Sequence, residues 1–191
     1  IVLYFHNDPL EMSGSKSIKE RKDILNKTEK IIFNSEWSKK RFTKNLNVIN
    51  LKSNKLQVIY QSVEKTKVNI GKKKNIITFV GKLNRAKGYD IFGKAILKIL
   101  DKYPNWKSNV FGDEPREKWI FNHKNLNIKG FKPHSEVLKN FRDSSITVVC
   151  SRWEEPFGRT SLEASSRGCA VIISNRGGLP ETVSNAIILR K

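Results

Sequence analysis

The feature that most constrains this chain is a regular alternation of short apolar runs with longer polar segments over residues 75–191. The apolar runs predict strands at 76–80, 107–111, 126–129, 146–149 and 170–173. The intervening segments predict helices at 87–100, 114–121, 135–141 and 159–167. Because the apolar runs lack strict period-two alternation, they are typical of parallel strands covered on both faces. The pattern therefore predicts an α/β fold with a doubly wound parallel sheet.

Residues 1–63 show the same alternation less regularly. They predict strands at 1–5, 31–33 and 56–59 and helices at 15–27 and 36–45, the second with Ser35 as its N-cap. Residues 64–74 are polar and basic, which is typical of a linker. The prediction is two Rossmann-like domains, 1–63 and 75–191, joined by 64–74.

The ends of the chain suggest a fragment. It opens directly in a strand-like run without an initiator methionine, and it ends just after the apolar run 186–189. We therefore expect the first domain to be only partly present and the second to be truncated at its C-terminus.

The chain is strongly basic, with 37 Lys and Arg against 18 Asp and Glu and a formal net charge of +19. Such a charge suits a nucleic acid, an anionic membrane surface or an anionic substrate. The lysines are scattered, and the one tight run, 72–74, lacks the interleaved aromatic residues of single-strand binders. This distribution favours a generally basic surface, compatible with peripheral contact with an anionic membrane. A nucleic-acid-binding protein remains the weaker alternative.

The sequence predicts a cytoplasmic protein, and the inner face of a membrane is a compatible location. No apolar run reaches the roughly 20 residues of a spanning helix, and residues 1–5 lack the basic start of a signal peptide. Cys150 and Cys169 are too far apart for a Cys-x-x-Cys site, and each adjoins an apolar run. We expect both to be buried, reduced thiols.

Four loops of the second domain carry glycine or charge directly after a predicted strand. In doubly wound sheets, ligands bind beyond the carboxyl ends of the strands. Glycines there let a bound group approach the backbone closely. These loops are 81–88, 112–114, 130–131 and 176–178.

The remaining loop, 151–158, precedes the helix that contains Glu163. The amides of Phe157 and Gly158 would face an anion there, with the positive end of the helix dipole behind them. Together the loops predict an anionic ligand at this edge of the sheet.

The string 155–164, Glu-Pro-Phe-Gly-Arg-Thr-Ser-Leu-Glu-Ala, resembles the signature of retaining GT-B glycosyltransferases of the family-4 type, the glycosyl transferases group 1. Residues 81–88 resemble the phosphate-binding loop of that family, 130–131 its turn near the nucleotide base, and 177–181 its later glycine motif. The motifs occur in the family's order, which makes the resemblance more specific than any one of them.

The resemblance implies transfer of a sugar, with retention, from a nucleotide-diphosphate donor to a glycan, lipid-linked or surface-polysaccharide acceptor. Glu155 would accept hydrogen bonds from the donor hexose, and Glu163 would bind the ribose. Lys82 and Lys87 would hold the diphosphate and stabilise the charge that develops as the sugar leaves. The family usually has arginine where this chain has Lys82, so Lys82 and Arg85 remain alternatives for the first phosphate ligand.

Residues 2–8 resemble the strand and loop in which related enzymes place a histidine near the reacting carbon, which makes His6 a candidate. The predicted catalytic residues are thus Glu155 and His6. His123 and His134 have no partner at a recognisable spacing and are predicted to be surface residues. The predicted donor-binding residues are Gly81, Lys82, Arg85, Lys87, Gly130, Phe131, Phe157, Gly158 and Glu163.

No cofactor and no metal ion are expected, since the chain has no Asp-x-Asp motif of the kind that holds a divalent ion in the other large glycosyltransferase fold. A nucleotide-sugar 2-epimerase, which grips a diphosphate on the same fold, stays open as an alternative enzyme. An inactive isolated fragment is compatible with either, because parts of both domains would be missing.

Overall fold

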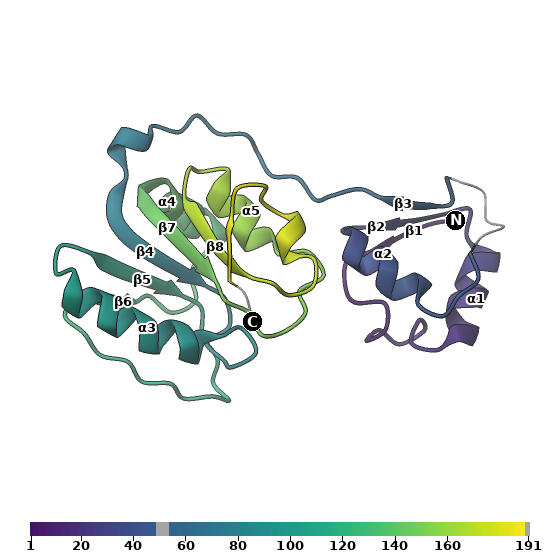
Figure 1. Ribbon diagram of the computed structural model, residues 1–191, viewed down its shortest axis with the longest axis horizontal. Coiled ribbons are helices and arrows are strands. Elements are labelled where there is room, and N and C mark those ends of the chain that lie inside the picture. The colour runs from purple at the N-terminus through teal and green to yellow at the C-terminus, as the bar shows by residue number, and fades with distance from the viewer. Residues whose placement is uncertain (49–53, 190–191) are drawn as a thin grey trace.

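The computed structural model describes residues 1–48 and 54–189. Residues 49–53 of the predicted first domain and 190–191 of the predicted second lie outside the described part. Two parallel sheets form two halves of the molecule, a smaller one that contains the N-terminus and a larger one that contains the C-terminus (Figure 1). The predicted α/β class with parallel sheets is confirmed.

The smaller half is a three-stranded sheet in the order β1, β2, β3. Ser17 caps the first helix in a capping box with Glu20, and Ser35 caps the second helix as predicted. The core includes three phenylalanine rings, Phe5, Phe33 and Phe42, with centroids 5.3–5.6 Å apart. The elements are β1 Val2–Phe5, α1 Ile18–Lys27, β2 Lys30–Phe33, α2 Glu36–Thr43 and β3 Leu56–Val58.

The larger half is a six-stranded sheet in the order β6, β5, β4, β7, β8, β9. Its elements are η1 Ile70–Lys72, β4 Lys74–Val80, α3 Tyr89–Lys102, β5 Lys107–Phe111, β6 Leu126–Ile128, α4 His134–Asp143, β7 Ser144–Val149, α5 Arg159–Ser165, β8 Ala170–Ser174, η2 Leu179–Glu181 and β9 Ile187–Leu189. The edge strand β9, which was not predicted, pairs in parallel with β8.

Two apolar clusters cover the two faces of this sheet. On one face, α3 buries Phe92 and Ile96 against β4 and β5. On the other face, Phe141 of α4 and Ala164 of α5 meet Ile173 of β8. Because the strands are buried on both sides, they lack period-two alternation, which is the pattern from which the sheet was predicted. Within the described residues, no helix is both long and apolar enough to cross a membrane.

The predicted helix at 114–121 is wrong, because this segment is irregular and runs along α3. The rings of Trp119 and Phe121 stack with centroids 6.5 Å apart, and Phe121 meets Tyr89 edge-on at 5.5 Å. Trp119 and Phe121 are two positions apart in the sequence, so their rings lie on the same side of an extended chain. A helix would turn them to opposite sides. Burial of both rings thus favours the extended form.

The predicted linker lies against the larger sheet in its second part. The ammonium of Lys73 donates hydrogen bonds of 2.6–2.8 Å to the backbone carbonyls of Phe141, Ser144 and Arg167. Burial lowers the pKa of Lys73 below its usual range. A basic residue of the linker therefore anchors this segment to the larger half.

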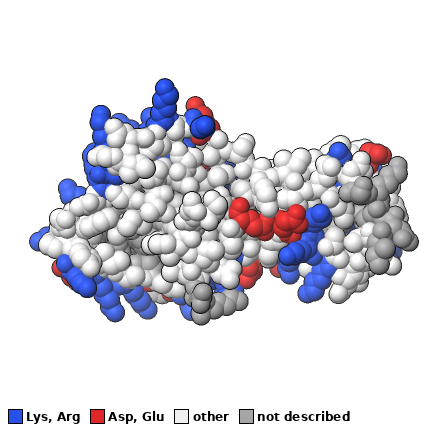
Figure 2. All heavy atoms as spheres, turned by 45° about the horizontal axis from the view of Figure 1, so that its top comes forward, with Lys and Arg blue, Asp and Glu red and all other residues white. Residues whose placement is uncertain are grey.

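Charged side chains on the face shown in Figure 2 occur in small groups over both halves, and acidic and basic groups meet at the junction between them. No extended basic stripe crosses this face, in keeping with the scattered lysines of the sequence.

Candidate functional site

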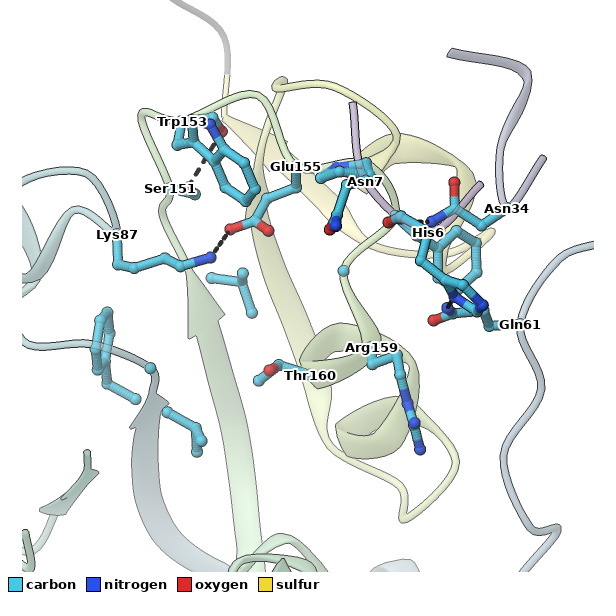
Figure 3. Close-up of a pocket in the computed structure, with 17 residues that line it drawn as sticks. His6, Asn7, Asn34, Gln61, Lys87, Ser151, Trp153, Glu155, Arg159 and Thr160 are labelled. Carbon is cyan, nitrogen blue, oxygen red and sulfur yellow. Dashed lines mark hydrogen bonds and ion pairs between the residues drawn. The ribbon is translucent and has the colours of Figure 1, made fainter. Parts of the chain in front are cut away.

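A pocket opens between the two halves, beyond the carboxyl ends of β4 and β7 (Figure 3). The smaller half contributes side chains that follow β1, β2 and β3, so both sheets direct their carboxyl ends toward one cavity. Six of the predicted site residues line it: His6, Gly81, Lys87, Glu155, Phe157 and Gly158.

Lys87 and Glu155 form an ion pair inside this pocket. The Lys87 ammonium also lies 4.8 Å from the centroid of the Trp153 ring, close enough for a cation–π interaction. Glu155 is buried, so its carboxylate depends on Lys87 for charge compensation. The two residues come from the phosphate-like loop after β4 and the loop after β7, which the fold brings together.

Hydrogen bonds to the loop after β8 hold the backbone around Glu155. The amide of Gly178 donates to the Glu155 carbonyl at 2.7 Å, and the amide of Gly177 donates to the Glu154 carboxylate at 2.6 Å. Gly177 has φ +58°, and a Cβ there would lie 2.1 Å from the Glu155 carbonyl oxygen. Only glycine fits this position without moving the Glu155 loop.

The glycines after β4, β5 and β6 are neighbours in space. The Gly112 amide donates to the Gly130 carbonyl at 2.9 Å, and a Cβ on Gly112 would lie 1.9 Å from the Gly81 carbonyl oxygen. The predicted phosphate loop and the predicted base-proximal turn therefore lie next to each other, and their glycines line one edge of the sheet.

Lys82, Arg85 and Phe131 lie outside the central pocket. Lys82 and Phe131 line a neighbouring cavity that shares Gly81 with it, and Phe131 is 78% exposed. The backbone of Arg85 donates to Glu117 and accepts from Arg152. Of the two alternative phosphate ligands, Lys82 is the one that lines a cavity next to the pocket.

The helix α5 begins directly at the pocket. Its N-cap, Gly158, has φ +109°, and within the described chain no side chain caps the helix. Phe157 is buried and stacks on Tyr60 of the smaller half, with ring centroids 6.0 Å apart. The uncapped helix start therefore faces the cavity as predicted, held on one side by an aromatic contact between the halves.

Glu163 is buried on α5 outside the central pocket. Its carboxylate lies 3.2 Å from the guanidinium of Arg159 and 3.1 Å from Nε2 of His134. His134 is a surface residue as predicted, with its side chain 60% exposed, and it has Glu163 as a partner that sequence spacing did not reveal.

His123 differs from the prediction of a surface residue. Its side chain is only 12% exposed, lies 3.3 Å from the Asp101 carboxylate and accepts the Asn125 amide. The contact with Asp101 joins two separate segments and does not follow from sequence spacing.

His6 lies in the loop after β1 at the edge of the pocket. Its Nδ1 lies 3.1 Å from Nε2 of Gln61, which is a hydrogen-bonding distance. The Asn34 side chain donates to the His6 carbonyl at 3.0 Å. Asp8, two residues on, is buried and accepts from the Arg41 guanidinium at 2.6–3.0 Å. The loop that carries His6 is thus tied to α2 and to the segment after β3.

The pocket residues that were not predicted as site residues include Asn34, Gln61, Trp153 and Thr160. Asn34 and Gln61 follow β2 and β3, so the rule that ligands bind beyond strand ends would have found them had it been applied to the smaller sheet.

Among residues 1–48 and 54–189, no three His, Cys, Asp or Glu side chains are grouped so that they could hold a metal ion. The expectation that no metal is needed stays a prediction. Cys150 and Cys169 are free and buried as predicted, and burial raises the pKa of Cys150 to about 11.

Comparison with known proteins identifies relatives of this chain. Residues 61–188 match the model of the family described as glycosyl transferases group 1. Spore coat protein SA of Bacillus subtilis is 31% identical over 126 residues, 58% of this chain and 33% of that protein. A D-inositol 3-phosphate glycosyltransferase of Corynebacterium jeikeium is 30% identical over 122 residues, 56% of this chain and 29% of that enzyme. The chain therefore spans about a third of these curated relatives.

Solved structures agree on the fold. Anabaena HepE in complex with UDP-glucose superposes with a TM-score of 0.71 at 18% identity, covering 98% of this chain and 57% of that one. A structure described as trehalose-6-phosphate from E. coli bound with UDP-2-fluoro glucose gives 0.70 at 12% identity, covering 99% and 56%. The two-sheet architecture is the GT-B architecture that the motifs predicted. With the match over 61–188, these findings establish that the chain belongs to the glycosyl transferases group 1 family.

Proposed function

We propose that the protein transfers a sugar, with retention, from a nucleotide-diphosphate donor to a glycan, lipid-linked or surface-polysaccharide acceptor. The observation that carries the proposal is the Lys87–Glu155 ion pair, which lies at the uncapped start of α5 in a pocket between two parallel sheets. A cation, free helix amides and a carboxylate at one place suit a ligand that has an anionic part and a hydroxylated part.

The donor would lie along the larger half. Its diphosphate would approach the glycine-lined edge and the start of α5, where backbone amides and Lys87 favour negative charge. Lys82 would add a second cation from the neighbouring cavity. As the bond to the sugar breaks, these groups would stabilise the charge that develops on the leaving diphosphate.

The two glutamates would recognise the two sugars of the donor. Lys87 would turn from the carboxylate toward the phosphate, which would free Glu155 to accept hydrogen bonds from the hexose hydroxyls. Glu163 would accept hydrogen bonds from the ribose in place of the Arg159 and His134 contacts. Both carboxylates are buried, so few water molecules would compete with the sugar hydroxyls for hydrogen bonds to them.

The smaller half would present the acceptor. We propose that residues 1–63 and 75–191 are the acceptor-side and donor-side domains, with 64–74 as their connection. His6 lies at the edge of the same pocket as Glu155 and would act near the reacting carbon.

The transfer as proposed uses no cofactor and no metal ion. A cytoplasmic location, including the inner face of a membrane, completes the proposal, and two buried, unpaired thiols are compatible with a reducing compartment.

The first experiment measures the thermal unfolding midpoint with UDP, GDP or ADP, in the unchanged protein and in Glu163→Ala. A ligand that binds only the folded state raises this midpoint. UDP is the first choice, since the HepE structure was determined with a uridine nucleotide. We expect a shift with one nucleotide that is absent in Glu163→Ala; no shift with any of them contradicts the donor site.

Product analysis then separates transfer from epimerisation. With donor sugar and no acceptor, a 2-epimerase converts the donor, whereas a transferase releases nucleotide only slowly, by hydrolysis. Epimerised sugar in the absence of acceptor would replace the proposal with the epimerase.

A further inference from the structure

The two halves meet at a second place, outside the pocket, through Glu181. This residue is the last one of η2. The backbone amides of Glu36 and Trp37, in the first turn of α2, donate to its two carboxylate oxygens at 2.6 and 2.9 Å. One side chain of the larger half thus accepts two hydrogen bonds from the backbone of the smaller half.

Close backbone contacts surround this interaction. The hydroxyl of Ser35 donates to the Pro156 carbonyl at 2.6 Å, and its oxygen also accepts the Ser38 amide as the N-cap of α2. A Cβ on Gly178 would lie 2.9 Å from the Ser35 side chain and 2.5 Å from the Pro156 carbonyl oxygen. Since Ser35 already caps α2 from within its own half, Glu181 supplies an additional contact between the halves.

The contact is connected to the pocket on both sides. In the larger half, the Glu181 amide donates to Gly178, whose own amide donates to the carbonyl of Glu155. In the smaller half, Asn34 immediately precedes the cap of α2 and its side chain donates to the His6 carbonyl. A short path of hydrogen bonds and covalent chain connections therefore runs from Glu155 through Glu181 and α2 to His6.

We propose that Glu181 is a positioning residue that locks the smaller half onto the larger one, so that His6 and Glu155 face the same cavity. A charged acceptor forms stronger hydrogen bonds than a neutral one, and two parallel bonds restrict rotation about the contact. Glu181 touches neither the pocket nor its predicted ligands. Its effect on catalysis rests on the proposed function, whereas its effect on the arrangement of the halves does not.

The geometric test measures a distance between the halves without any nucleotide. Spin labels are attached at Lys22→Cys on α1 and Lys98→Cys on α3, both exposed positions, while the two native thiols are buried. Double electron–electron resonance then gives the distance distribution in Glu181→Ala, Glu181→Gln and a matched control. The control, Glu36→Ala, removes an exposed carboxylate from the same helix turn and leaves both amide contacts in place.

A positioning role predicts a longer or broader distribution in Glu181→Ala, an intermediate one in Glu181→Gln, which keeps one acceptor oxygen, and an unchanged one in Glu36→Ala. Amide hydrogen exchange at Glu36 and Trp37 should become faster while the interior of α2 stays protected. An unchanged distribution in Glu181→Ala overturns the proposal. Faster amide exchange throughout α2 of Glu181→Ala, with an unchanged distance between the spin labels, also overturns the proposal. That result would mean that Glu181 only caps the helix locally. If Glu181→Ala does not fold, the Glu181→Gln distribution decides.

The catalytic test follows once a donor nucleotide is known to bind. Because the predicted donor contacts belong to the larger half, Glu181→Gln should lower kcat about tenfold or more while the donor KM stays within about twofold. An altered distance with unchanged kcat keeps the geometric role and removes the catalytic one. Failure of nucleotide binding contradicts the proposed function alone.

Discussion

The ammonium of Lys87 contacts the carboxylate of Glu155 across the carboxyl ends of β4 and β7. The two residues are far apart in the sequence. They come together because β4 and β7 are neighbouring parallel strands whose carboxyl ends lie at the same edge of the sheet. The pair gives a buried carboxylate an opposite charge and keeps a cation beside the start of α5. In the proposed function, this pair would separate when an anion and a hydroxylated group enter together.

Under the proposed function, Glu155→Gln should lower turnover by about 100-fold or more, since it removes a charged acceptor from the donor sugar. The fold should persist, because the amide retains a polar group of the same shape. Steady-state kinetics with a far-UV circular dichroism melt checks both statements. Full activity in Glu155→Gln would remove this residue from the site.

Lys87→Met should destabilise the protein without ligand by about 1–2 kcal/mol, because it leaves Glu155 buried without its partner. The expected loss is smaller than for a fully buried ion pair, because the Lys87 side chain is 28% exposed and water can reach the pair. Urea unfolding measures the difference. The double variant Lys87→Met with Glu155→Gln should recover part of the loss; strict additivity of the two changes would show that the pair does not interact.

Gly177→Ala should lower both stability and activity. A left-handed backbone at a non-glycine residue costs about 1–2 kcal/mol, and the Cβ would also collide with the Glu155 carbonyl oxygen, 2.1 Å away. Gly14→Ala is the matched control, because Gly14 has φ +86° and nothing within 4 Å of an added Cβ. Equal losses of stability in the two variants, measured by urea unfolding, would show that the collision is relieved without cost.

The Asp90–Arg152 pair should stabilise the folded protein at neutral pH and lose this contribution at acid pH. Arg152 donates to Asp90 at 2.5 and 2.8 Å and holds the pKa of that carboxyl below 3.8, against the opposing effect of burial. The folded state therefore binds the proton less readily than the unfolded state. The contribution is complete above pH 3.8 and is lost as the pH falls from there through the lower pKa of the folded state.

Asp90→Asn should accordingly reduce the free energy of unfolding at pH 7 by about 1–2 kcal/mol. The difference from the unchanged protein should shrink in urea titrations below pH 3.8. Asp23→Asn, at an exposed pair with Lys27, is the control and should change stability by less than about 0.5 kcal/mol. A difference for Asp90→Asn that is the same at pH 3 and pH 7 would contradict the pKa assignment.

Both native thiols should resist labelling in the folded protein. Burial raises the pKa of Cys150 to about 11 and also raises that of Cys169. At pH 8, roughly one Cys150 in a thousand would then be the reactive thiolate. A thiol assay should detect no rapid reaction until urea unfolds the chain, whereas exposed Lys22→Cys should react at once. Rapid native-state labelling would show that the neighbourhood of Cys150 opens readily.

The sequence by itself determined the class of fold and the region of the site. Strand and helix periods are local, so the apolar runs of 76–80 and 146–149 were recognisable, as was the capping serine Ser35. Motif order identified the family, and the rule of strand ends located Lys87 and Glu155 at one edge. The helix expected at 114–121 failed because burial of Trp119 and Phe121 against α3 outweighs local propensity.

The tertiary structure alone decided which side chains meet. Glu181 against the amides of Glu36 and Trp37, Gln61 beside His6, and His134 beside Glu163 all join residues far apart in the chain. No period or spacing records such contacts, because they depend on how two halves approach and how helices cover a sheet. Local composition determines where strands and helices form; the packing of those elements determines which of their polar groups become partners.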